Sequence, residues 1–230
     1  MTSKKKWLKA LNARTKNYQY NEKIIKIDPV TPDLSVIERA ASIIKKGGVV
    51  VFPARSMYGI AANALSVDAL ERIYEMKKRP AAKPLLVLVP AGYDLSVIVT
   101  TIPEKALEIM KKFWPGLITV VLRARETLPG RLTAGTGKIG IRVPGNPVAS
   151  LLAEKTGFPI TGTSANISEM ESCTKIADLP EEIIESVDLV LDSGELGGGK
   201  GSTVIDCSGD RIEILREGNV TARDLVDFLG

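Results

Sequence analysis

The 230-residue sequence predicts an α/β (α+β) fold in which a twisted, mixed β-sheet is flanked by helices. Two observations carry this prediction. Helical and strand patterns alternate in the first half of the chain, as they do where helices connect the strands of one sheet. Short apolar segments crowd together in the second half, which is typical of mixed strand pairing. We find no internal repeat, low-complexity segment or interdomain linker, so residues 31–230 are predicted to form one domain.

Helices are predicted where apolar residues recur every three or four positions behind a capping residue. The first covers residues 32–46 and ends before two consecutive glycines. Ser66 is the expected N-cap of the second helix, which ends at Lys77 or Lys78. Three more helices are expected over residues 103–113, over residues 147–156 and from Thr221 onwards.

Strands are predicted as short apolar or β-branched runs bounded by turn-forming residues. They cover residues 49–52, 85–89, 118–123, 138–143, 159–163, 189–192, 203–207 and 212–215. Apolar runs of this length are far shorter than the roughly 20 residues that a membrane-spanning helix needs. We therefore expect no membrane association.

Basic residues are concentrated at the N-terminus. Residues 1–28 hold eight lysines and arginines against two acidic residues, although the whole chain has a formal charge of only +4. We therefore predict a basic N-terminal extension over residues 1–30. Such a segment can contact nucleic acid or an acidic membrane surface, or it can be a solvated extension. The N-terminal segment lacks the apolar core of a secretory signal. We expect Cys173 and Cys207 to be buried thiols of a cytoplasmic protein.

The sequence contains no histidine. The commonest general base and metal ligand is therefore absent, and every Ser-His or Cys-His mechanism is excluded. Chemistry must use lysine, arginine, hydroxyl groups, carboxylates, backbone dipoles and whatever metal the substrate brings.

A basic segment follows the second predicted helix. Arg79 and Lys83 lie there between Pro80 and Pro84, which restrict the path of the chain. The basic residues could simply interact with the helix C-terminus. Because the prolines make the segment rigid, a phosphate-binding role is the alternative interpretation.

Other candidate binding groups also lie where predicted strands end, a position that collects ligand-binding residues in open sheets. Ser56 follows the first strand, and residues 161–168 carry five hydroxyl or amide side chains that could bind phosphate or form an ordinary polar turn. Arg142 and Arg216 occupy comparable strand ends. Together with Arg79 and Lys83, these arginines suggest a polyanionic ligand that is accompanied by a carboxylate.

The glycine-rich segment 194–203 nearly matches a phosphate-binding P-loop. Gly194, Gly199 and Lys200 have the required spacing, but Gly201 stands where serine or threonine should follow. A P-loop also opens a helix, whereas residues 202–206 are rich in β-branched side chains and predict a strand. We interpret the segment as a flexible glycine loop that enters a strand.

From about Asp33 to Val220 the chain resembles the YrdC-type threonylcarbamoyl-AMP synthase family. The dispersed family signature, Lys-x-Arg followed far downstream by Ser-x-Asn, is present as Lys77, Arg79, Ser164 and Asn166. Further family-like blocks lie at residues 113–116, 142–144, 163–168, 202–204 and 215–218. The resemblance implies a YrdC/RibB-like fold with a positively charged concave groove.

The resemblance also implies an activity. Enzymes of this family condense L-threonine, bicarbonate and ATP into threonylcarbamoyl-AMP and pyrophosphate. Mg²⁺ would arrive with ATP, and no protein-bound metal site is expected. Downstream threonylcarbamoyl-transfer proteins would pass the group to an adenosine beside the anticodon of tRNA. Contact with tRNA or double-stranded RNA is a candidate interaction.

Site residues follow from the resemblance by matched position. The signature tetrad Lys77, Arg79, Ser164 and Asn166 would be catalytic. Arg79, Lys83, Lys138, Ser164, Ser172 and Arg216 would hold ATP, and Ser56, Arg142 and Ser202 would hold threonine. A site without histidine suits such a reaction, because positioning and charge neutralisation supply most of its catalysis.

The chain departs from the family pattern in three places. The family usually has Pro-Thr-Glu-Thr where this chain has Pro53-Ala54-Arg55-Ser56. Leu88 stands where the family has a histidine, and Glu169 stands where the family has a glycine. The nucleotide half of the site is therefore better kept than the threonine half. Three alternatives stay open: a paralogue that adenylates a different carbamate, an RNA-binding YrdC-like module without adenylate synthesis, and a regulatory domain that binds a nucleotide without turnover.

Overall fold

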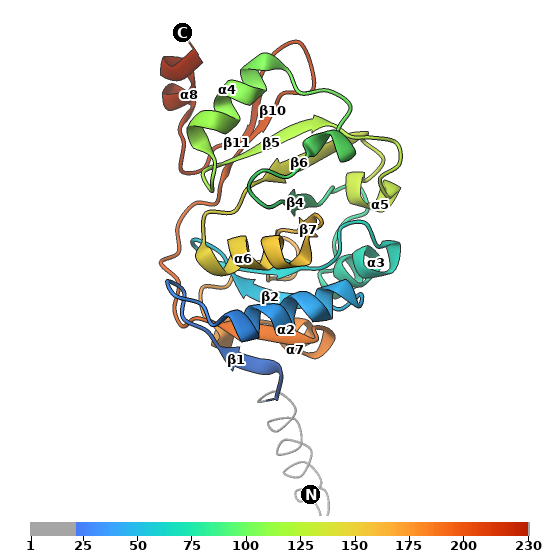
Figure 1. Cartoon of the computed structure of the whole chain (residues 1–230), viewed down its shortest axis with the longest axis vertical. Helices are drawn as coiled ribbons and strands as arrows, with labels where there is room; N and C mark the ends of the chain where they lie inside the picture. Colours follow the sequence, from blue (N-terminus) through green and yellow to red (C-terminus); the bar gives the residue numbers. More distant parts are fainter. Residues whose placement is uncertain (1–21, 230) are drawn as a thin grey trace, which may run out of the picture.

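The computed structural model describes residues 22–229, which form two mixed β-sheets with helices outside them (Figure 1). The first sheet has the strand order β1 (Ile24–Lys26), β9 (Leu189–Asp192), β2 (Val50–Pro53), β3 (Tyr58–Ala61) and β8 (Thr163–Ser164). The second has the order β11 (Glu213–Arg216), β10 (Thr203–Asp206), β5 (Ile118–Arg123), β6 (Lys138–Arg142), β4 (Leu86–Leu88) and β7 (Ile160–Thr161). The predicted α/β class with mixed strand pairing is confirmed, but the strands divide between two sheets rather than forming one.

The two sheets meet at a bend in residues 160–164, where a single strand was predicted. Strand β7 pairs antiparallel with β4 of the second sheet, and β8 pairs antiparallel with β3 of the first. Gly162 lies between them. A Cβ atom at this position would lie 2.7 Å from Leu86 Cδ1 and 2.8 Å from Leu88 Cγ. The close approach of the two leucines therefore requires glycine at the bend.

Seven α-helices lie within the described residues. They are α2 (Leu34–Lys45), α3 (Val67–Met76), α4 (Glu104–Phe113), α5 (Gly130–Thr133), α6 (Pro147–Thr156), α7 (Glu181–Ser186) and α8 (Ala222–Leu229). All five predicted helices are confirmed, and Ser66 caps α3 by accepting a hydrogen bond from the Ala69 amide. Helices α2 and α6 pack side by side against the first sheet, whereas α4 and α8 lie beside the second (Figure 1).

The N-terminal extension predicted over residues 1–30 lies mostly outside the described residues. Within the described part, β1 joins the edge of the first sheet and runs parallel to β9. Its last residue, Lys26, forms an ion pair with Asp192 at 2.6 Å. Cys173 and Cys207 are buried free thiols, as expected. No helix within residues 22–229 is long and apolar enough to cross a membrane.

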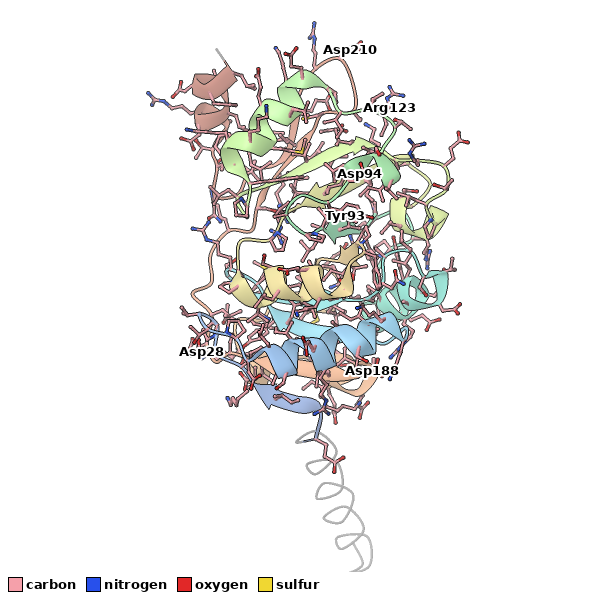
Figure 2. The ribbon with its side chains drawn as sticks, in the orientation of Figure 1. Asp28, Tyr93, Asp94, Arg123, Asp188 and Asp210 are labelled. Carbon is pink, nitrogen blue, oxygen red and sulfur yellow. The ribbon has the colours of Figure 1, made fainter. Side chains whose placement is uncertain are left out.

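Polar side chains fix the outer elements to the sheets. Asp188, labelled in Figure 2, accepts a hydrogen bond from the Val49 amide at 2.7 Å and pairs with Arg72 of α3 at 2.9 Å. Arg123, Asp94 and Asp210 lie toward the opposite end of the molecule in the same view.

The core between the two ends of the molecule is continuous. One cluster of buried side chains includes Val51 and Ile60 of the first sheet together with Val87, Val120 and other residues of the second. The two sheets therefore share one buried core.

Candidate active site

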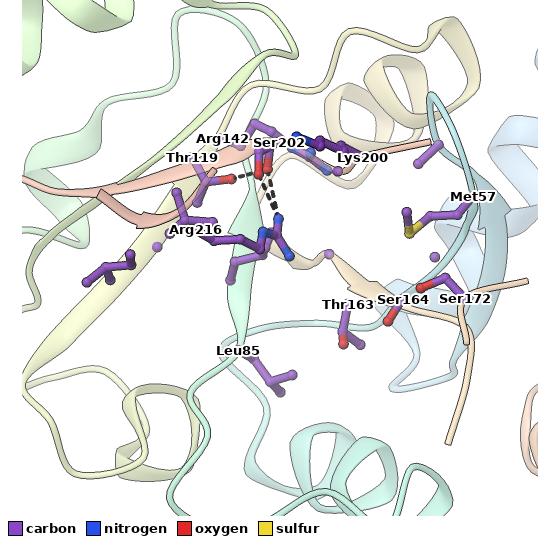
Figure 3. Close-up of a pocket in the computed structure, with 18 of the residues that line it drawn as sticks. Met57, Leu85, Thr119, Arg142, Thr163, Ser164, Ser172, Lys200, Ser202 and Arg216 are labelled. Atoms are coloured by element: carbon purple, nitrogen blue, oxygen red, sulfur yellow. Dashed lines mark hydrogen bonds between the residues drawn. The ribbon is translucent and has the colours of Figure 1, made fainter. Parts of the chain in front are cut away.

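A cavity of about 670 Å³ is lined by residues from both sheets (Figure 3). Eight of the eleven predicted site residues line it: Ser56, Arg79, Lys138, Arg142, Ser164, Ser172, Ser202 and Arg216. They come from segments that are up to 160 positions apart in the sequence, and the fold brings them to one hollow. Lys77, Asn166 and Lys83 are not among its lining residues.

Lys77 and Asn166 lie beneath the cavity wall rather than on it. Both are buried, and the Lys77 ammonium donates hydrogen bonds to the backbone oxygens of Ser164 and Asn166 at 2.5 and 2.6 Å. It also donates to Asn166 Oδ1 at 3.1 Å, and the same oxygen accepts the Ser164 hydroxyl at 2.5 Å. Burial, with a smaller contribution from the Arg79 charge, lowers the pKa of Lys77 to about 7. These contacts fix the position of Ser164, which faces the cavity.

Arg79 is fixed by the loop that follows it. Its Nε donates to the Lys83 carbonyl at 3.0 Å, and its Nη2 donates to the Pro84 carbonyl at 2.7 Å. The Tyr74 hydroxyl donates to the same Lys83 carbonyl at 2.7 Å. The guanidinium is therefore held rigidly at the cavity wall. Its charge has no carboxylate partner within the described residues, and burial lowers its pKa.

Lys83 has a different environment from Arg79. Its side chain is exposed, does not line the cavity and forms an ion pair with Glu169 at 2.9 Å. Glu169 has a backbone φ of 73°, in the left-handed region that favours glycine. The departure from the family pattern noted at this residue thus falls on a backbone conformation in which glycine is unstrained.

A hydroxyl and arginine cluster forms the opposite wall. The hydroxyls of Thr119 and Ser202 are hydrogen bonded at 2.8 Å, and Arg216 Nη2 donates to the Ser202 carbonyl at 2.8 Å. Figure 3 shows Arg142 beside Ser202, across the hollow from Ser164 and Ser172. The Arg142 side chain has no hydrogen-bond or ion-pair partner within residues 22–229, and its Nε is buried. Burial, followed by the nearby Arg216 charge, lowers the pKa of Arg142 to about 10, so Arg142 is still cationic at neutral pH.

The charged residues that line the cavity are mostly basic. It contains six basic residues and two acidic ones, Asp206 and Glu217. Each acid pairs with a lysine: Asp206 with Lys138 at 2.7 Å and Glu217 with Lys200 at 3.9 Å. The other four cations, Arg55, Arg79, Arg142 and Arg216, have no carboxylate partner in the described part of the chain. The cavity is therefore suited to a ligand with several negative charges.

Sequence reasoning missed several polar residues that line the cavity, among them Arg55, Thr119 and Lys200. Arg55 lies in the turn between β2 and β3, which was noted only as a departure from the family pattern. Thr119 lies inside the predicted strand 118–123, and only the pairing of β5 with β10 places its hydroxyl beside Ser202. Leu88, another departure, is fully buried against Gly162 and does not line the cavity.

The described residues contain no group of three or more histidine, cysteine or acidic side chains placed to hold a metal ion. Both carboxylates that line the cavity pair with lysines.

Comparison with known proteins identifies the family. The model for Sua5, YciO and YrdC proteins, described as "Telomere recombination", matches residues 42–218. The chain belongs to the Sua5/YciO/YrdC family. The resemblance inferred from the signature residues is thus confirmed.

The similar members of the family differ in length. The chain is 36% identical to the threonylcarbamoyl-AMP synthase of Bacillus subtilis over 87% of its own length and 60% of that protein. The structure of Pyrococcus abyssi Sua5 complexed with L-threonine superposes with a TM-score of 0.85 at 35% identity, covering 90% of this chain and 61% of that one. Escherichia coli YciO has a TM-score of 0.77 at 31% identity and is covered over 98% of its length. The chain spans about three fifths of the two longer relatives.

Proposed function

We propose that this protein is an L-threonylcarbamoyladenylate synthase. It would condense L-threonine, bicarbonate and ATP into threonylcarbamoyl-AMP and pyrophosphate. The observation that carries the proposal is the convergence of four arginines without carboxylate partners on one cavity whose walls also present serine hydroxyls. The names of the similar synthases and the L-threonine complex of Pyrococcus abyssi Sua5 support the choice of substrate.

The charge of the cavity suits this combination of substrates. A triphosphate beside an amino-acid carboxylate and a carbamate carries several negative charges, which one Mg²⁺ offsets only in part. The four arginines would compensate the remainder. The metal ion would enter with ATP and would stay bound to its phosphate oxygens.

Two bond-forming steps are proposed. The threonine amine attacks the carbon of bicarbonate, and water leaves to give a carbamate. A carbamate oxygen then attacks the α-phosphorus, while the bond to the bridging oxygen of the β-phosphate breaks and pyrophosphate leaves. The protein contributes alignment and charge neutralisation rather than a covalent intermediate, which agrees with the absence of histidine from the sequence.

The nucleotide is proposed to lie along Arg79, Ser164, Ser172, Lys138 and Arg216. Ser164 would turn its hydroxyl hydrogen from Asn166 Oδ1 to a phosphate oxygen, while Lys77 holds the backbone oxygens of Ser164 and Asn166 in place. Lys77 and Asn166 therefore act as positioning residues. Lys83 is proposed to reach the phosphates after its ion pair with Glu169 opens.

Threonine is proposed to bind at the opposite wall. Arg142 would pair with its carboxylate, because this guanidinium is unpartnered and lies beside the cavity. Ser202 and Ser56 would bind the remaining polar groups of the amino acid. Ser202 is already oriented by Thr119 and Arg216.

The product would be consumed by threonylcarbamoyl-transfer proteins that modify tRNA in the cytoplasm.

A pyrophosphate-release assay tests the proposed reaction. Each amino acid is supplied in turn with MgATP, with and without bicarbonate, and the adenylate is identified by mass spectrometry. Release that depends on both threonine and bicarbonate is the expected result, with a loss of at least about tenfold in Arg79→Ala and in Ser164→Ala. Preference for another amino acid would instead indicate a paralogue with a different carbamate. ATP binding without any release would reject the synthase assignment.

A further inference from the structure

A small side pocket of about 20 Å³ adjoins the main cavity. It shares Ala54, Arg55, Gly116 and Arg142 with the cavity wall, and residues 144–146 and Ala149 at the start of α6 close its far side. A space of this size accommodates a group no larger than one or two water molecules. It is too small for any side chain much larger than a methyl group, but it can hold one or two oxygens of a small anion.

The charge around the side pocket is one-sided. Its lining contains two arginines and no acidic residue. Arg55 is exposed and has no hydrogen bond or ion pair within residues 22–229, whereas the Nε of Arg142 is buried and has no hydrogen-bond partner. An unpartnered buried donor is costly, because it has given up its hydrogen bonds to water. The side pocket therefore offers donors that no protein group satisfies.

The N-terminus of α6 adds to this positive potential. Helix α6 has ten residues, with Asn146 as N-cap and Pro147 in its first turn. Asn146 Oδ1 already accepts the Val148 and Ala149 amides, so the helix contributes its dipole rather than free N–H groups. The Asn146 amide also donates to the Ala54 carbonyl at 3.3 Å, which fixes the turn that carries Arg55 against the helix.

We propose that Arg55 and Arg142 form a subsite for the small oxyanion substrate, bicarbonate, at the edge of the main cavity. The inference rests on the proposed function and adds to it a residue, Arg55, that has no role in the nucleotide or threonine contacts assigned above. In this arrangement Arg142, which lines both the main cavity and the side pocket, serves two anions: the amino-acid carboxylate in the cavity and the oxyanion in the side pocket. The amine and the bicarbonate carbon are thereby brought together before the carbamate forms.

Kinetics with separate substrates test the role of Arg55. At saturating MgATP and threonine, Arg55→Ala should raise the KM for bicarbonate by about tenfold, which corresponds to the loss of one charge-assisted hydrogen bond. The KM values for threonine and ATP should stay within about twofold, and Arg55→Lys should recover part of the loss. Arg39→Ala, which removes an exposed arginine from α2, is the matched control. An increase in the threonine KM alone would assign the side pocket to the amino-acid carboxylate and overturn the proposal, as would unchanged KM values.

Binding without turnover separates this inference from the proposed function. The probe is ¹³C-labelled bicarbonate, whose NMR line width is measured with the protein and α,β-methylene-ATP, in the absence of an amino acid. Broadening with the unaltered chain that disappears in Arg55→Ala supports the subsite, even if no pyrophosphate is released with threonine. No broadening with the unaltered chain overturns the subsite, even if the synthase reaction proceeds.

Discussion

The carboxylate of Glu169 accepts a hydrogen bond from the Lys83 ammonium at 2.9 Å, and Glu169 itself has a backbone φ of 73°. An acidic residue thus occupies a strained backbone position and pairs with a lysine that is proposed to bind phosphate. The hydrogen bond from Lys83, followed by the Lys83 charge, lowers the pKa of Glu169. Bound ATP and Glu169 would therefore compete for the same ammonium.

Removing this competition should tighten nucleotide binding. We expect Glu169→Gln to lower the Kd for ATP by about threefold, a modest effect because exposed ion pairs are weak. Isothermal titration calorimetry at low and high salt provides the measurement, and the difference should shrink as salt is added. Glu38→Gln breaks a comparable exposed pair with Lys155 far from the cavity and should leave the Kd unchanged. Equal affinities for Glu169→Gln and the unaltered chain would exclude the competition.

Arg142 should destabilise the ligand-free protein because its charge is buried without a partner. We expect Arg142→Met to raise the free energy of unfolding by about 1 kcal/mol or more in the absence of ligand. The same substitution should raise the KM for threonine by at least about tenfold. Urea denaturation and pyrophosphate release together measure this exchange of stability for function. A variant that is less stable than the unaltered chain would show that packing of the Arg142 side chain outweighs its charge.

Gly218 packs tightly against the backbone of residues 201–203, beside the cavity wall that carries Ser202 and Arg216. A Cβ atom there would overlap the carbonyl oxygen of Gly201 and lie 2.5 Å from the carbonyl carbon of Ser202. Its amide also donates to Thr203 Oγ1 at 2.9 Å. Gly218→Ala should therefore push Arg216 away from Ser202 and lower stability by about 2 kcal/mol or more.

Thermal denaturation measures the effect of Gly218→Ala. The matched control is Gly209→Ala, since a Cβ atom at Gly209 would meet nothing within 4 Å. Similar melting temperatures for the two variants would contradict the proposed clash.

Lys77 gives the protein a defined dependence on pH. Its pKa in the folded chain is lowered to about 7, whereas an exposed lysine titrates near 10.5. Between these values the unfolded chain binds more protons than the folded one, so stability rises with pH, and below about pH 7 the dependence disappears. We expect the difference in unfolding free energy between the unaltered chain and Lys77→Met to grow in favour of the unaltered chain by about 1 kcal/mol per pH unit from pH 7.5 to 9.5. A difference that is constant over this range would contradict the lowered pKa.

Much of the secondary structure could be predicted because its signals are local. Residues 118–123, 147–156 and 189–192 match β5, α6 and β9 at both ends. Caps and apolar periodicity act within a few residues, so the sequence contains them directly. The short strand β3, in contrast, contains Gly59 and Ala61, residues with low strand propensity. It is a strand because β2 and β8 pair with it on either side.

The candidate site could be predicted only in part. The signature residues and the arginines were recognisable by type and order, and eight of the eleven predicted residues do line one cavity. The division into two sheets could not be predicted, because it depends on the close approach of Leu86 and Leu88 to Gly162, which is a tertiary contact. For the same reason Arg55 could not be placed beside Arg142 from the sequence, since β2 and β6 lie in different sheets.

The bend at Gly162 has a mechanical consequence. On this side of the cavity a single residue, Gly162, joins β7 to β8, and each of these strands is paired in a different sheet, so the separation of the two sheets is fixed there. Two other connections between the sheets border the cavity. Residues 62–85 include helix α3, whereas the segment 193–202 contains five glycines and no helix or strand. We expect any widening of the entrance to occur there, as a rotation about the bend, so that large substrates are admitted and product is released without disrupting the packing of either sheet.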